Sequence, residues 1–134
     1  MGAWGIGAFE NDAALDWVSD LEAEGVHSIT GALSLEDADD YLDVDVGCEG
    51  IAAAEVVAAA RDGDAGTLPE PVREWLDANA GSITSDHVQA AAKFLARVLD
   101  DDSEIAELFA EGPDAAAWRD EVEALLARLA PQTS

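Results

Sequence analysis

The sequence predicts an all-α fold: a single compact bundle of about six or seven short helices, with a Gly/Trp-rich N-terminal segment packed on it. Three observations favour this fold. Apolar residues recur at helical spacing in most segments, and glycine or proline separates those segments. The one short stretch with strand-like alternation, residues 43–47, has no partner of similar character, so we expect a loop there. A chain of 134 residues has the length of one domain, and we expect residues 1–134 to form it.

Two helices are expected near the start of the chain. Asn11 or Asp12 can cap the first by accepting a backbone N–H bond, and Gly25 ends it. Gly31 weakens the second helix, which is shorter, and Ser34 can begin a further turn after it. The apolar positions of the two helices are Ala14, Trp17, Val18 and Leu21, followed by Val26, Ile29 and Leu33.

The middle of the chain contains the expected central helix. Residues 50–61 are rich in alanine and apolar on nearly every side, as in a helix that is packed on several sides. Pro71 suits the first turn of the next helix, which we expect to end near residues 79–81. Thr84 or Ser85 then caps the clearest amphipathic helix. Its apolar stripe comprises Val88, Ala91, Ala92, Leu95, Val98 and Leu99.

Two more helices are expected toward the C-terminus. Asp102 or Ser103 can cap a short helix that ends at Gly112 and Pro113. Pro131 stops the last helix. That helix places on one face Trp118, Val122, Leu125 and Leu129.

The charge of the chain is strongly unbalanced. Thirty Asp and Glu residues stand against six Lys and Arg, which gives a formal net charge of -24. Salt screens the resulting self-repulsion, so we expect a salt-adapted, halophilic or similarly acid-biased source. An acidic nucleic-acid mimic is an alternative. Direct nucleic-acid binding is not expected, because no basic patch is present to neutralise phosphates.

The composition also indicates the compartment. With 49% hydrophobic residues, the chain is too apolar for a disordered acidic tail. Cys48 is the only cysteine, so an intrachain disulfide cannot form. We see no signal peptide and no apolar run of the ~20 residues that a membrane helix needs. A cytoplasmic protein without membrane contact is therefore expected.

The glycine-rich opening segment resembles a phosphate-binding loop only superficially. It lacks the GxxxxGK[ST] pattern and a preceding strand, and acidic residues that would repel an anion follow it directly. We interpret its glycines as allowing a tight backbone turn. That turn would press Trp4, Ile6 and Phe9 onto the bundle as a hydrophobic lid.

Three carboxylates are the candidates for a metal or hydrolase-like site. Asp12 and Asp16 share a helix face and could hold a cation, although acids in a first turn are also favoured by the helix dipole. Glu55 interrupts an apolar run and could act as a general acid or base if it were buried. We interpret the stripe containing Glu55 as the exposed edge of its helix or, if Glu55 is buried, consider Arg73 one possible partner. The other members of that stripe are Ile51, Ala58 and Asp62.

The opening MGAWGIGAFENDAALDW resembles the start of the DUF4259 family, small bacterial and archaeal proteins of unknown function. The segments YLD, AAAEVVAAA, VREWL and DDDSEIAELF also resemble that family. The resemblance therefore covers nearly the whole chain but implies no activity. The positions that match the family pattern are Trp4, Gly5, Phe9, Asn11, Asp12, Asp16, Trp17 and Glu55.

The sequence therefore favours a non-enzymatic cytoplasmic protein-interaction module with an acidic surface and another protein as its partner. No catalytic residue and no cofactor are expected. The alternative from a different class is the metal-binding or hydrolase-like protein that uses Asp12, Asp16 and Glu55. The two histidines, His27 and His87, lie far apart in the sequence and are not expected to form a metal site.

Overall fold

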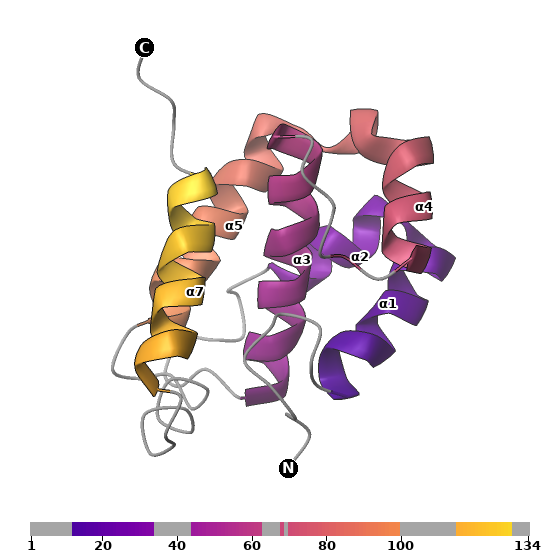
Figure 1. Ribbon diagram of the computed structural model, residues 1–134. Helices are drawn as coiled ribbons and strands as arrows, with labels where there is room; N and C mark the ends of the chain where they lie inside the picture. The colour runs from indigo at the N-terminus through magenta and orange to yellow at the C-terminus, as the bar shows by residue number, and fades with distance from the viewer. Residues whose placement is uncertain (1–11, 34–43, 63–67, 69, 100–114, 130–134) are drawn as a thin grey trace.

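The computed structural model describes residues 12–33, 44–62, 68, 70–99 and 115–129. Within these residues it contains six α-helices, one short 3-10 helix and no strand, so the all-α prediction is confirmed there (Figure 1). The elements are α1 (Asp12–Glu24), α2 (Val26–Ala32), α3 (Val44–Asp62), α4 (Glu70–Asn79), η1 (Ala80–Ser82), α5 (Ser85–Val98) and α7 (Ala115–Leu129).

Helix α3 lies at the centre of the bundle, as the sequence predicts. It contacts α1, α2, α4, α5 and α7, and Figure 1 shows it between α5 and α7 on one side and α1 and α4 on the other. Most of its side chains are Ala or Val, which let neighbouring helices approach closely from several directions. The apolar side chains of α3 that the structure describes as fully buried include Ala52, Ala53, Ala54, Val56, Val57 and Ala58.

The predicted loop at residues 43–47 is wrong, because α3 begins at Val44. Gly47, Cys48 and Ile51 are buried and recur at helical spacing. The short alternation of this segment matches a strand over a few residues only. Helical packing against neighbouring elements therefore decides the conformation, as it does for most helices in proteins.

Helices α3 and α5 pack tightly at Gly50. A Cβ atom placed on Gly50 would overlap the ring of Phe94, which is fully buried. Only glycine fits at this position without a shift of the aromatic ring. The predicted apolar stripe of this helix does not include Phe94, although its ring fills the contact between α3 and α5.

Helices α1 and α2 form a tight pair. Gly25 adopts φ +65° and donates its N–H to the Leu21 carbonyl at 2.8 Å, which ends α1 as predicted. The Trp17 indole N–H donates to the Ser28 carbonyl at 3.2 Å and connects the two helices. The predicted apolar face of α1 is confirmed, because Ala14, Trp17, Val18 and Leu21 are buried.

The positions of α4, α5 and α7 are confirmed, and the predicted apolar stripe of α5 is confirmed in part, because Ala91, Leu95 and Val98 are buried. Pro71 lies in the first turn of α4, and Thr84 precedes α5. His87 Nδ1 accepts the Thr84 backbone N–H at 3.0 Å, so it occupies the place that Glu or Gln takes in a capping box. The buried residues of α7 match the predicted face: Trp118, Val122, Leu125 and Leu129.

Other expectations concern residues outside the described part of the chain. These are the N-terminal lid, the cap at Asn11, the turn after Ser34, the helix capped at Asp102 or Ser103 and the stop at Pro131. Among the helices that are described, none is long and apolar enough to cross a membrane.

Candidate functional site

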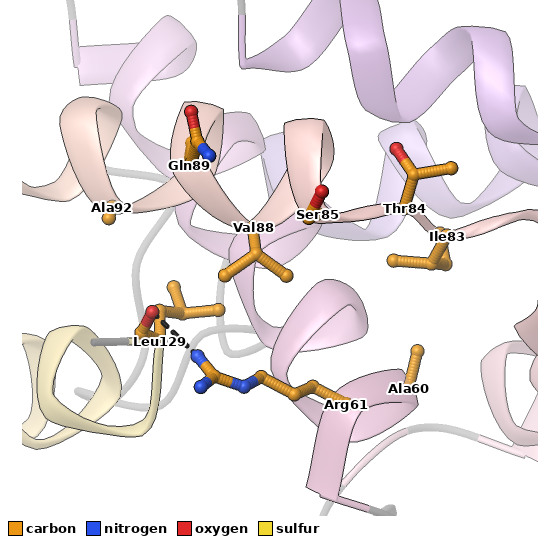
Figure 2. A pocket seen from close by; sticks show the side chains of 9 residues that line it. All are labelled: Ala60, Arg61, Ile83, Thr84, Ser85, Val88, Gln89, Ala92 and Leu129. Carbon is orange, nitrogen blue, oxygen red and sulfur yellow. Dashed lines mark hydrogen bonds between the residues drawn. The ribbon is translucent and has the colours of Figure 1, made fainter. Parts of the chain in front are cut away.

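A cavity of about 550 Å³ lies where the C-terminal ends of α3 and α7 meet the start of α5 (Figure 2). Its polar lining comes from Arg61 on α3 and from Thr84, Ser85 and Gln89 at the start of α5. The remaining lining is aliphatic and consists of Ala60, Ile83, Val88, Ala92 and Leu129. The cavity thus combines an aliphatic wall with one cationic and three neutral polar side chains.

Arg61 extends along the cavity from the last turn of α3 (Figure 2). Its Nη1 donates to the Leu129 carbonyl at 2.7 Å and to the Arg128 carbonyl at 3.4 Å. Carbonyls in the last turn of a helix lack partners within that helix and form its negative end, which a cation stabilises. Arg61 therefore caps α7. It forms no salt bridge with a carboxylate among the described residues.

Arg128 makes the reverse connection from α7 to α3. Its Nη1 lies 3.2 Å from Glu55 Oε2, and the two side chains are 30% and 18% exposed. Partial burial weakens screening by solvent, so this pair is stronger than an exposed one. Two arginines thus join α3 and α7, one through backbone carbonyls and one through a carboxylate.

The interpretation of the Glu55 stripe as an exposed edge of α3 is wrong. Ile51 is 6% exposed and Ala58 is fully buried, because neighbouring helices pack against this face of α3. The partner of Glu55 is Arg128 rather than Arg73, whose side chain is exposed on α4. A helical wheel could not identify this partner, because α7 is far from α3 in the sequence.

The metal candidates that the structure describes have different surroundings. Asp16 is exposed on α1, and Glu55 is paired with Arg128. Asp12 begins α1, but its side chain is outside the described part, so its role stays a prediction. No group of three or more His, Cys, Asp or Glu side chains that could hold a metal occurs among the described residues.

Among the family-motif positions that the structure describes, Trp17 and Glu55 connect helices, whereas Asp16 is exposed. Trp17 is buried and holds α2 through its indole N–H, while Asp16 faces solvent. Glu55 connects α3 to α7. The motif positions outside the described residues are Trp4, Gly5, Phe9 and Asn11.

His87 has a structural role as well. Its Nδ1 accepts from the Thr84 backbone, and its Nε2 lies 3.3 Å from Thr30 Oγ1 on α2. Both ring nitrogens therefore have partners, one at the start of α5 and one on a neighbouring helix. His27 is exposed on α2.

Sequence reasoning did not identify Arg61 as a site residue. The available signal was its place at the end of a long apolar helix, where an arginine can reach backbone carbonyls. That signal does not specify which carbonyls it reaches. The cavity itself depends on three helix ends that are distant in the sequence.

Comparison with known proteins identifies a family but no characterised relative. A family model described as a domain of unknown function, DUF4259, matches residues 2–121. Searches of curated proteins and of solved structures found no match. Since the family model covers most of the chain, the protein belongs to the DUF4259 family, whose function is unknown.

Proposed function

We propose that this protein is a non-enzymatic, cytoplasmic interaction module whose acidic surface binds a basic protein partner. The observation that carries the proposal is the charge on the exposed sides of α1 and α4, two helices that contact each other (Figure 1). We call these exposed sides the α1–α4 surface. Its acidic residues are Asp16, Asp20, Glu22, Glu24, Glu70, Glu74 and Asp77.

The α1–α4 surface also contains an apolar contact point. Leu15 on α1 is 41% exposed, whereas the other large hydrophobic side chains that the structure describes are buried or partly buried. Arg73 is the exposed cation of α1 and α4, so acidic groups dominate the potential there. Like-signed charges steer an oppositely charged partner and select against acidic ones. An exposed leucine adds apolar area to the contact.

The same charge supports adaptation to a salt-rich cytoplasm. At a net charge of -24, counterions must screen the surface for the compact state to be stable. A basic partner competes with those counterions. We therefore expect the interaction to weaken as salt rises while the fold itself becomes more stable.

Crosslinking in cells of the source organism tests the proposal. We would compare the wild type with Asp16→Asn/Asp20→Asn on α1 and with Asp120→Asn/Glu121→Gln on α7. Both variants remove two exposed charges, but only the first alters the α1–α4 surface. The expected result is one reproducible basic partner whose capture falls about tenfold or more in the α1 variant and is retained in the α7 variant.

Two results would contradict the proposed function. Equal losses in the two variants would indicate non-specific attraction to negative charge. Recovery of no reproducible partner from cells that contain folded protein would remove the basis for an interaction module.

A further inference from the structure

We infer that the cavity between α3, α5 and α7 binds a small carboxylic acid with an apolar body, and that Arg61 holds the carboxylate. This inference concerns the opposite side of α3 from the α1–α4 surface. It does not depend on the proposed function.

The size and lining of the cavity fit the apolar body of such a ligand. Its volume of about 550 Å³ lies within the range of small-molecule sites, roughly 300–1,000 Å³. Val88 and Ala92 on α5 face Leu129 of α7 across the cavity. An aliphatic chain placed between them would leave water and contact methyl groups on both sides.

Arg61 supplies the complementary charge. Both of its hydrogen bonds to the end of α7 use Nη1, whereas a guanidinium carries five N–H donors. The donors on Nε and Nη2 make no hydrogen bond with any residue that the structure describes. A carboxylate can accept two parallel N–H bonds from a guanidinium. Capping of α7 therefore leaves donors that a ligand carboxylate can use.

Within the described part of the chain, Arg61 makes its hydrogen bonds to backbone carbonyls rather than to a carboxylate. Arg119 and Arg128 each pair with a carboxylate, whereas Arg61 donates to the neutral carbonyls of Arg128 and Leu129. Partial burial between helices strengthens attraction to an incoming anion. The first turn of α5 also lines the cavity, and the positive end of that helix dipole favours the same sign of ligand charge.

The ligand class follows from the balance of these groups. One cationic side chain suits one negative charge, and the aliphatic residues that form most of the remaining lining suit a hydrocarbon body. Asp86 in the first turn of α5 further disfavours a larger anionic charge, although it is exposed and does not line the cavity. A monocarboxylate on a hydrocarbon chain matches both parts of the lining.

Calorimetric titration of the full chain in molar salt tests the inference, with octanoate as the probe and octanol as its uncharged match. We expect saturable binding of one octanoate, with octanol at least about tenfold weaker. Hexanoate should bind more weakly than octanoate and decanoate more tightly, because each added methylene should raise the affinity about two- to fourfold.

Three variants locate the site. Arg61→Gln should weaken octanoate binding about tenfold or more, whereas Lys93→Gln removes an exposed cation from α5 and should leave binding unchanged. Ala92→Leu fills the cavity without altering Arg61 and should also weaken binding. The Ala92→Leu variant therefore still tests the inference if the Arg61→Gln variant unfolds because α7 has lost its cap. Equal affinity for octanoate and octanol, equal losses in Arg61→Gln and Lys93→Gln, unchanged binding by Ala92→Leu or no binding by the folded wild type would each overturn the inference.

Discussion

The two sides of α3 are held by different interactions. Toward α5 and α7, a glycine admits the Phe94 ring and two arginines connect α3 to α7. Toward α1 and α4, the contacts are made by buried apolar side chains, and acidic groups cover the outer surface. The difference indicates that close packing and side-chain hydrogen bonds connect α3 to the α5–α7 side, whereas apolar packing beneath exposed acidic groups forms the α1–α4 side.

The largest expected effect comes from a substitution that disrupts packing on the α5–α7 side. Gly50→Ala should destabilise the protein by about 3 kcal/mol, because the new Cβ overlaps the buried Phe94 ring. Gly31→Ala on α2 is the matched control. No atom lies within 4 Å of a Cβ placed there, and alanine favours a helix over glycine by about 1 kcal/mol.

Denaturant unfolding of both variants in molar salt measures this difference. Stabilisation by Gly31→Ala together with strong destabilisation by Gly50→Ala is the expected pattern. Equal effects of the two substitutions would show that helix propensity, rather than the contact with Phe94, governs position 50.

This contact illustrates what the sequence can predict and what it cannot. The amphipathic pattern and the Thr84 cap predict α5, and the run of small residues predicts that α3 is central. Those signals are local. The pairing of Gly50 with Phe94 depends on the register between two helices, which neither helix encodes alone.

The candidate site is even less predictable for the same reason. Glu55 and Arg128 are separated by 73 positions, and Arg61 and Leu129 by 68. Residues on the helix wheel of α3 identify Glu55 as a polar interruption but give no information on which helix covers it. The local pattern does not predict the start of α3, because its first residues alternate over a few positions only and packing against neighbouring elements stabilises the helix there.

The second expected effect distinguishes the α1–α4 side by its response to salt. Stability of the wild type should rise by about 2 kcal/mol between low and molar salt, because the Debye length falls to about 3 Å at 1 M. Asp16→Asn/Asp20→Asn should flatten this dependence, since it removes two exposed charges from α1. Thermal unfolding over a salt series, monitored by circular dichroism, provides the measurement. A melting temperature of the wild type that does not change with salt would contradict environmental adaptation of the surface.

The smallest expected effect sharpens the role of the arginines on the α5–α7 side. Arg128→Met keeps an apolar stem but leaves the partly buried Glu55 without this cation, so we expect a loss of about 1–2 kcal/mol. Arg119→Met removes the cation of an exposed pair with Glu123, whose side chains are 53% and 51% exposed, and should cost about 0.5 kcal/mol or less. Urea unfolding in molar salt compares the two variants while long-range charge effects are screened. Equal losses of stability in the two variants would show that partial burial does not strengthen the ion pair between Arg128 and Glu55. The arginine connection would then be no different from the exposed charges elsewhere on the bundle.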